Sequence, residues 1–253
     1  IPFCKQACYY CDFHFSTSLT RKDEMIAAIC QEIELRKSEL NNTIIETIYF
    51  GGGTPSILSI NEINKIIDVV YQRHSVVSSP EITLEANPDD LSNEKIIELS
   101  ESKINRLSIG IQSFFEQDLQ LMNRAHNSDE AKKCLEIATH YFKNISIDLI
   151  YGIPDCNNKQ WIENIETALS FGIPHISSYA LTVEPKTALA RCWTLPSVKA
   201  WPPSPNGIAP PPWCCPWMRI RRWWTRKVAR WTASVMSSMP CCCACRHPVP
   251  AMP

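Results

Sequence analysis

Three cysteines near the start of the chain have the residue type and spacing that most clearly indicate chemistry. Cys4, Cys8 and Cys11 are separated by three and then by two residues. As thiolates they are soft ligands, suited to an iron–sulfur cluster or to zinc. A structural zinc site and an ordinary electron-transfer cluster each take four protein ligands, so three cysteines leave one metal position for another ligand. The alternatives are a zinc site completed by Asp12 or His14, and three unrelated core thiols.

The elements that would position these cysteines alternate between strands and helices. A truncated first strand is predicted to run into the cysteine loop, and further strands are predicted over residues 43–50, 81–87, 106–112, 145–151 and 175–182. Helices are predicted over residues 20–40, from a capping box at Ser59 and Glu62, from about Ser92, and over residues 115–124, 128–142 and 158–171. Such alternation implies right-handed βαβ units and a parallel sheet. Six strands predict an α/β fold, a partial (β/α)6 TIM-like barrel.

Glycines and polar residues stand at the ends of the predicted strands, where the chemistry of a parallel barrel collects. The run Gly51-Gly-Gly-Thr-Pro55 follows the second strand and would let backbone approach a ligand closely. Glu85 lies near the end of the third strand, Gln112 ends the fourth, and Asp148 lies inside the fifth. A buried carboxylate needs partners, which a ligand can supply. The alternatives are a tight turn for the glycines and a fold-stabilising acceptor for each carboxylate.

Several short stretches together resemble the radical S-adenosylmethionine (SAM) superfamily, whose proteins carry a CxxxCxxC signature. They resemble in particular its branch of oxygen-independent coproporphyrinogen III oxidase-like proteins. The stretches are Ile-Pro-Phe-Cys, Phe-Gly-Gly-Gly-Thr-Pro, Glu-Ala-Asn-Pro, Ser-Ile-Gly-Ile-Gln-Ser-Phe, Asn-Arg-Ala-His and Ile-Asp-Leu-Ile-Tyr-Gly-Ile-Pro. The resemblance covers residues 1 to about 189 and implies the six-unit barrel of that superfamily.

The resemblance also implies cofactors and the residues that bind them. Cys4, Cys8 and Cys11 would hold three irons of a [4Fe-4S] cluster, and SAM would chelate the fourth iron. An electron from the cluster would then cleave SAM. The implied SAM-binding positions are Tyr10, Gly52, Gly53, Thr54, Glu85, Gln112, Arg124, Asp148 and Ala180.

The resemblance to this branch implies two alternative functions. A heme chaperone would carry the cluster and SAM, bind heme, pass it to apo-hemoproteins of the respiratory chain, and depend on an electron donor. An oxidase would decarboxylate two propionates of coproporphyrinogen III in porphyrin biosynthesis. The oxidases resemble CxxxCxFCxC, whereas Cys11-Asp12-Phe13 lacks the last thiol, so the chaperone is favoured. His14, His126 and His140 are candidate heme ligands by residue type.

The composition changes abruptly at about Ala190. All 26 acidic residues and 16 of the 25 Lys and Arg precede it, so residues 1–189 carry a formal charge of −10 and the last 64 carry +9. Such a segment can be a basic nucleic-acid-binding tail. Seven of the eight Trp and seven of the 13 Cys also lie there, without helical, strand or metal-ligand periodicity. We therefore predict a core domain over residues 1–189 and a frameshifted or disordered tail over 190–253, with no nucleic-acid partner.

The sequence also indicates a cellular compartment. It contains no apolar run of about 18 residues and nothing that resembles a signal peptide, so no integral membrane segment is expected. The expected compartment is the cytoplasm, where the 13 cysteines would be thiols or metal ligands. The chain begins at Ile1 without an initiator Met, and its N-terminus is expected to be missing.

Overall fold

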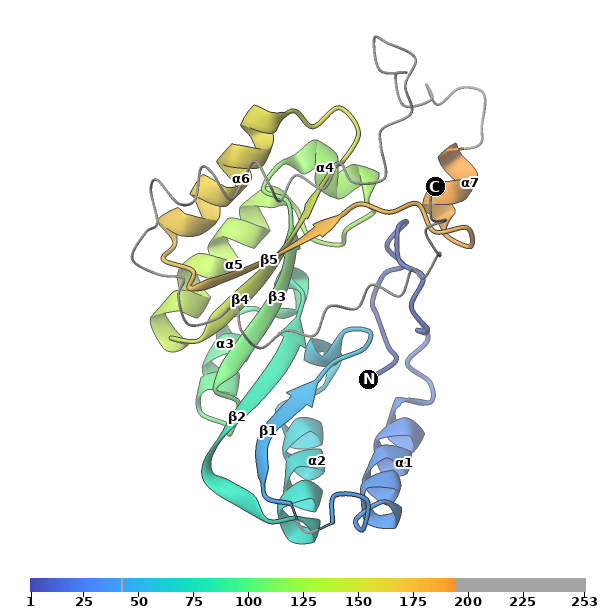
Figure 1. The fold of residues 1–253 in the computed structure, drawn as a ribbon, viewed down its shortest axis with the longest axis vertical. Coiled ribbons are helices and arrows are strands. Elements are labelled where there is room, and N and C mark those ends of the chain that lie inside the picture. Colours follow the sequence, from blue (N-terminus) through green and yellow to red (C-terminus); the bar gives the residue numbers. More distant parts are fainter. Residues whose placement is uncertain (42, 194–253) are drawn as a thin grey trace, which may run out of the picture. The chain divides into compact units, whose positions relative to one another are not determined.

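Five parallel strands form one curled sheet in the computed structural model, which describes residues 1–41 and 43–193. In spatial order, which is also chain order, the strands are β1 (Ile45–Phe50), β2 (Val76–Ala86), β3 (Arg106–Gln112), β4 (Ile145–Tyr151) and β5 (His175–Ala180). Figure 1 shows the sheet curving like part of a barrel, with the N-terminal segment beside the arrowhead of β1. The predicted α/β partial barrel is confirmed.

Helices connect the strands, and short 3-10 turns follow the first two strands. The α-helices are α1 (Lys22–Leu35), α2 (Ile60–Arg73), α3 (Asn93–Ser100), α4 (Glu116–Leu121), α5 (Ser128–Tyr141), α6 (Asn158–Ser170) and α7 (Ala188–Trp193). The 3-10 turns are η1 (Pro55–Ile57) and η2 (Pro88–Asp90). The predicted capping box of Ser59 and Glu62 is confirmed, and Asn127 and Asn157 begin α5 and α6 in the same way.

The two faces of the sheet have opposite character. On β3, Leu107, Ile109 and Ile111 are fully buried and belong to the hydrophobic cluster that includes the helices. The alternate residues of β3 and β4 face the inside of the barrel, where the Ser146 hydroxyl donates to the Ser108 hydroxyl (3.1 Å). Side chains alternate between the two faces along a strand. Here the residues that point outward are mostly apolar and those that point inward are mostly polar. The inner face is therefore suited to polar ligands.

The predicted first strand is not formed, so the described sheet has five strands instead of six. Phe3 makes only an isolated bridge with Ser16. The carbonyl of Ile1 accepts from the Gly53 amide (2.8 Å), and the carbonyl of Phe3 accepts from the Thr54 amide (2.7 Å). These bonds hold the N-terminal segment against the turn after β1 and not along the strand itself.

Strand β2 begins at Val76, five residues before its predicted start. Pro80 lacks a backbone N–H and is usually excluded from strand interiors. The pairing shifts register there, because Ile45 lies opposite Val76 whereas Thr47 lies opposite Glu81. The additional residues of β2 are thus accommodated by an irregularity at the edge of the sheet.

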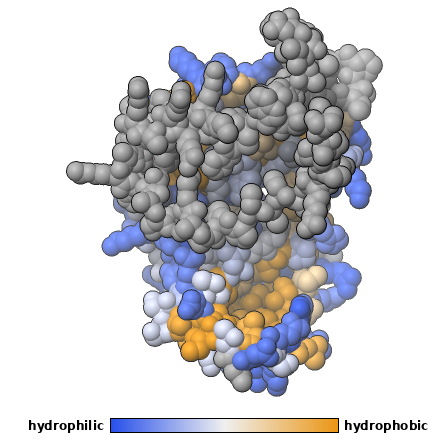
Figure 2. Space-filling view, in the orientation of Figure 1, coloured by the Kyte–Doolittle hydropathy of each residue, from blue (hydrophilic) through white to orange (hydrophobic). Residues whose placement is uncertain are grey.

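The first helix is shorter than predicted at both ends. The predicted cap at Thr20 is not formed, because the helix begins at Lys22, after Arg21, which makes no side-chain capping bond. It ends at Leu35 and not at Leu40. Leu35, Leu40 and Ile44 are exposed, and core packing therefore does not extend the helix. Apolar surface is visible in Figure 2 in the region where Figure 1 places α1, α2 and β1.

Two further predictions concern the ends of the chain and membranes. Helix α7 spans the predicted boundary at Ala190, and residues 194–253 lie outside the described part, so the division into a core and a tail stays a prediction. Among residues 1–41 and 43–193, no helix is long and apolar enough to cross a membrane.

Candidate functional site

The cysteine loop is fixed to the turn that follows β1. The backbone bonds from Gly53 and Thr54 to the N-terminal segment bring this turn beside Cys4. The Thr54 hydroxyl, which is buried, donates to the Cys4 sulfur (3.4 Å). The turn therefore places a hydroxyl donor on the first predicted ligand, and hydrogen bonds to sulfur are one way in which a protein tunes an iron–sulfur cluster.

The glycines of this turn are required by its geometry. Gly52 has a φ of +115°, which side-chain-bearing residues rarely adopt. A Cβ atom on Gly53 would lie 2.6 Å from the Phe3 carbonyl oxygen. The Gly52 amide donates to a carboxylate oxygen of Glu85 (3.1 Å), whose other oxygen accepts from the Tyr49 hydroxyl (2.7 Å). Glu85 and the glycine turn are thus brought together, as expected for residues at the carboxyl ends of neighbouring strands.

Arg124 connects the cysteine loop to the sheet. One guanidinium nitrogen, Nη1, lies 3.3 Å from both the Cys8 sulfur and the Tyr10 hydroxyl. The other, Nη2, donates to the Asn87 side-chain oxygen (2.7 Å) and to the Gly110 carbonyl (2.8 Å). The Nε atom is buried and has no partner among the described residues. Cys8, Tyr10 and Arg124, which are distant in sequence, therefore form one cluster.

Asn87 is a member of this cluster that the sequence analysis missed. Its side-chain nitrogen donates to the Thr54 hydroxyl (3.2 Å), and its side-chain oxygen accepts from Arg124. It thereby joins the residue that contacts Cys4 to the residue that contacts Cys8. The signal was present, since Glu85-Ala-Asn87-Pro was among the stretches that carry the family resemblance.

The remaining predicted SAM positions lie on β3, β4 and β5, with Gln112 and Ala180 at strand ends and Asp148 in the middle of β4. Gln112 is buried with a φ of +68°, and its side-chain nitrogen lies beside Gly110, which Arg124 contacts. Burial raises the pKa of Asp148 to about 6, and the charge of Glu85 adds to this effect. Ala180 is exposed and lies opposite Tyr151 in the register of β4 and β5. Asp148 is therefore electrostatically coupled to Glu85, whereas Ala180 lies at the edge strand.

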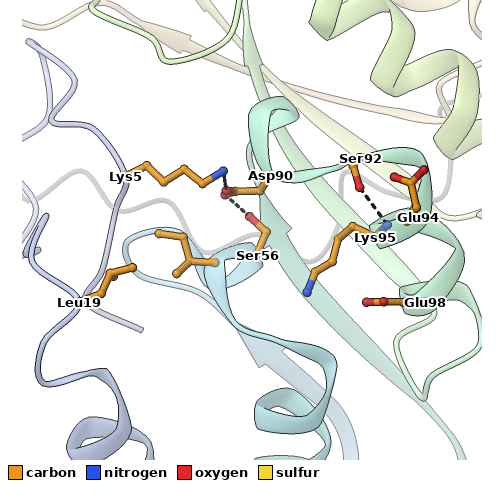
Figure 3. A pocket seen from close by; sticks show the side chains of 9 residues that line it. Lys5, Leu19, Ser56, Asp90, Ser92, Glu94, Lys95 and Glu98 are labelled. Carbon is orange, nitrogen blue, oxygen red and sulfur yellow. Dashed lines mark hydrogen bonds and ion pairs between the residues drawn. The ribbon is translucent and has the colours of Figure 1, made fainter.

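Lys5 attaches the cysteine loop to η2, the 3-10 turn that follows β2. Its ammonium group pairs with Asp90 and Asp89, and Asp90 also accepts from the Ser56 hydroxyl (2.7 Å). Figure 3 shows Lys5 and Ser56 converging on Asp90 at one side of a pocket of about 420 Å³. Lys95 lines the other side, and none of the three cysteines lines this pocket. The pocket therefore neighbours the cysteine loop without being the predicted metal site.

The thiols have the chemistry that an iron–sulfur cluster requires. Cys4, Cys8 and Cys11 are free and partly buried. Burial raises the pKa of the Cys4 and Cys11 thiols, so metal binding would release their protons. Within the described ranges, no three His, Cys, Asp or Glu side chains are gathered so that they could share one metal ion. A [4Fe-4S] cluster does not require such sharing, because each thiolate binds a different iron.

The three histidines considered as heme ligands differ in exposure. His14 and His140 are exposed, and the His140 Nδ1 atom lies 2.6 Å from the Glu136 carbonyl oxygen. His126 is buried, and its Nε2 atom lies 3.1 Å from the Ile111 carbonyl oxygen. Burial, aided by the charge of Arg124, lowers the pKa of His126 to about 3. A buried ring already bonded to backbone is poorly placed to ligate a heme, so His126 is the weakest of the three candidates.

The buried His126 predicts a dependence of stability on pH. The pKa is about 3 in the folded chain and about 6.5 in the unfolded chain. Between these values the unfolded chain binds a proton that the folded chain does not, so the free energy of unfolding falls as the pH falls, by about 1.4 kcal/mol per unit. We expect metal-free protein to lose about 2 kcal/mol from this source between pH 7 and pH 5.

The measurement is urea unfolding at both pH values for the parent chain and for His126→Gln, which retains a side-chain N–H donor. Asp148, whose pKa is raised, contributes with the opposite sign, and its effect cancels in the difference between the two proteins. Parallel stability curves for the two proteins would contradict the assignment of the pH dependence to His126.

Comparisons with known proteins agree with this arrangement. A family model described as the radical SAM superfamily matches residues 1–168. The heme chaperone HemW of Bacillus subtilis (strain 168) is 39% identical over 190 residues, and that of Escherichia coli (strain K12) is 33% identical over 190 residues. Each alignment covers 74% of this chain and 50% of the relative. The chain thus spans about half the length of the curated relatives it matches.

Among solved structures, the coproporphyrinogen III oxidase HemN from Escherichia coli, described as a radical SAM enzyme, superposes with a TM-score of 0.68. It is 25% identical, and the match covers 75% of this chain and 44% of HemN. A second structure, archaeal Elp3 from Methanocaldococcus infernus, shares the fold with a TM-score of 0.54 at 19% identity. The family model, the sequence relatives and the fold agree, and the protein belongs to the radical SAM superfamily, in the HemN-like branch that includes HemW.

Proposed function

We propose that the protein is a HemW-like heme chaperone that carries a [4Fe-4S] cluster and SAM and transfers heme to apo-hemoproteins of the respiratory chain. The observation that carries this proposal is the joining of Cys4 to Thr54 and of Cys8 to Arg124 at the carboxyl ends of the parallel strands. In a chain whose curated relatives are HemW proteins, this arrangement supports a cluster held at the opening of the barrel. The proposed site of action is the cytoplasm.

The described residues fit the two cofactors. Cys4, Cys8 and Cys11 would bind three irons, while Thr54 and Arg124 would donate hydrogen bonds to the sulfurs or to SAM. When bound, the cluster would supply single electrons received from a donor protein, and SAM would fill the metal position that the three cysteines leave open. The remaining SAM-binding positions that we propose are Tyr10, Gly52, Gly53, Glu85, Gln112, Asp148 and Ala180.

Within this proposed site, the charges of the chain would orient SAM. Glu85 accepts from the Gly52 amide and shares the inner face with Asp148, so these two carboxylates could accept hydrogen bonds from hydroxyl groups of SAM. Arg124 is held by Asn87 and by the Gly110 carbonyl, which fixes its positive charge near the cysteine loop. This charge would balance the negative charge of thiolates or of a carboxylate of SAM.

The second candidate is an oxygen-independent coproporphyrinogen III oxidase, and the structural similarity to HemN favours it. The residue two places after Cys11 separates the two functions, because it is Phe13 and not the additional cysteine of the oxidase pattern. The Phe13 side chain is exposed next to the cysteine loop. No thiol is therefore available at this position.

The experiment that tests the proposal uses protein purified without oxygen and reconstituted with iron and sulfide. Heme is titrated and followed by absorbance, and coproporphyrinogen III turnover is assayed in parallel with SAM and a reductant. We expect stoichiometric heme binding without decarboxylation. Decarboxylation that disappears in Cys8→Ser would establish the oxidase instead, and reconstituted protein that neither binds heme nor decarboxylates would contradict both functions.

A further inference from the structure

The cysteine loop is held by the turn that ends α4, which lies more than a hundred residues away in the chain. The Gln6 side chain donates to the Asn123 carbonyl (2.9 Å), and the Asn123 side chain donates in return to the Ala7 carbonyl (2.8 Å). The Tyr9 amide donates to the Met122 carbonyl (3.0 Å). These three bonds fall on residues between Cys4 and Cys11, and they fix the part of the loop that carries the middle cysteine.

Asn123 occupies a backbone position that is usually filled by glycine. The Arg124 amide donates to the Leu119 carbonyl (2.9 Å), and the Asn123 amide donates to the Gln120 carbonyl (3.0 Å). This pair of bonds is the Schellman arrangement at the end of a helix, and its left-handed residue is Asn123, with a φ of +54°. Glycine would meet the backbone requirement at lower cost. The side chain of Asn123 therefore adds something that the turn itself does not need, namely the bond to Ala7.

The same turn directs Arg124 toward the loop. Because Arg124 follows Asn123 directly, the reversal of the chain at Asn123 sets the position from which the Arg124 side chain extends. That group reaches the Cys8 sulfur and the Tyr10 hydroxyl, both at 3.3 Å. One turn thus fixes the residue before Cys8 through Asn123 and the sulfur of Cys8 through Arg124.

We infer that Asn123 is a positioning residue, which holds the cysteine loop in the shape that receives the cluster before any metal binds. Among the described residues, its own hydrogen bonds reach Gln6, Ala7 and Gln120 and no sulfur atom, so it acts through Ala7 and through the placement of Arg124. The assignment of a cluster to this loop rests on the proposed function. We call the two bonds between Asn123 and the loop, one with Gln6 and one with Ala7, the clamp. The clamp is a property of the metal-free chain and can be measured without the cluster.

The first measurement is hydrogen exchange of the metal-free chain, with Asn123→Gly as the test variant. We expect the Tyr9 amide to exchange about five-fold faster in this variant, the factor to which one ordinary hydrogen bond corresponds. Asn41→Gly is the matched control, because Asn41 also has a positive φ of 46° but lies in the turn after α1. The control should leave exchange in the cysteine loop unchanged, and equal exchange in both variants would overturn the inference.

The second measurement is the rate at which an iron chelator removes iron from the reconstituted chain. We expect Asn123→Gly to lose iron about five-fold faster than Asn41→Gly, for the same reason. Gln6→Leu removes the other half of the clamp without altering the α4 turn, and it should shift exchange and iron loss in the same direction. This variant keeps the test decisive if Asn123→Gly does not fold, because unchanged exchange in Gln6→Leu would also overturn the inference.

The two proposals fail in different ways. If the parent chain takes up no iron and sulfide, the cluster assignment is wrong, and the exchange experiment alone decides whether the clamp exists. If the parent chain binds a cluster but loses iron at the same rate with and without the Asn123 side chain, the cluster assignment stands and the positioning role is wrong.

Discussion

Replacing Cys4, Cys8 or Cys11 singly by serine is expected to lower the iron content after anaerobic reconstitution from about four atoms per chain to less than about one. A serine hydroxyl is a harder ligand than a thiolate and does not ionise near neutral pH, so it cannot complete the set of three soft ligands. The measurement is iron and acid-labile sulfide per chain, together with the visible absorbance of the cluster.

The matched control for these variants is Cys30→Ser. Cys30 is free and partly buried like the three loop cysteines, but its side chain packs against the hydrophobic core from α1. We expect this variant to retain the iron content of the parent chain. Equal loss of iron in Cys30→Ser, or full retention in Cys8→Ser, would show that the loop cysteines are not the ligands.

Folding and metal binding can be separated in this experiment. The three cysteines lie in a loop and are only partly buried, whereas the core is built from the outer face of the sheet and the helices. Substitutions outside a core usually change the free energy of unfolding by about 0.5 kcal/mol or less. The metal-free serine variants should therefore unfold at nearly the urea concentration of the parent chain.

The strand pattern allowed much of the site to be predicted. Because parallel strands place their carboxyl ends at one edge, polar residues near the strand ends were expected to contribute to one site, and the charge of Glu85 acts on Asp148. The glycine run after β1 was expected to let backbone approach a ligand closely, and the backbone that lies closest to Gly53 is that of Ile1 and Phe3 in the chain itself. Both features depend on local spacing and on the topology of the sheet, which the sequence pattern indicates.

Other features could not be predicted because they depend on contacts between distant residues. In the sequence, Asn87 ends a predicted strand and Asn123 lies in a predicted helix, and only the fold brings Asn87 to Thr54 and Arg124 and Asn123 to Ala7. The early start of β2 was missed because Pro80 normally excludes a strand. The six-strand count failed because the N-terminal segment bonds the turn at Gly53 and Thr54 and does not extend the sheet.

Gly53→Ala is expected to destabilise the metal-free chain by about 2 kcal/mol, the middle of the range for an overpacked position. The new Cβ would lie 2.6 Å from the Phe3 carbonyl oxygen and 3.0 Å from both the Phe3 nitrogen and the Ile1 carbonyl oxygen. All three are backbone atoms, so no side-chain rotation can relieve the contact. The N-terminal segment must move, and its bonds to Gly53 and Thr54 must lengthen.

This displacement should reach the metal site, because Cys4 directly follows Phe3 and its sulfur accepts from Thr54. We therefore expect Gly53→Ala to take up less iron than the parent chain even under conditions where it remains folded. Urea unfolding of the metal-free protein measures the first effect, and iron content after reconstitution measures the second. The two readouts together distinguish a shifted N-terminal segment from a general loss of stability.

Gly172→Asn is the control for Gly53→Ala. Gly172 has a φ of +71°, and a Cβ there would meet nothing within 4 Å. Asparagine tolerates this conformation better than other side-chain-bearing residues, so we expect the free energy of unfolding to fall by only about 1 kcal/mol and the iron content to be unchanged. A Gly53→Ala chain as stable and as rich in iron as Gly172→Asn would mean that the turn after β1 can move away from Phe3 without cost. The close backbone approach at Gly53 would then not be what positions Cys4.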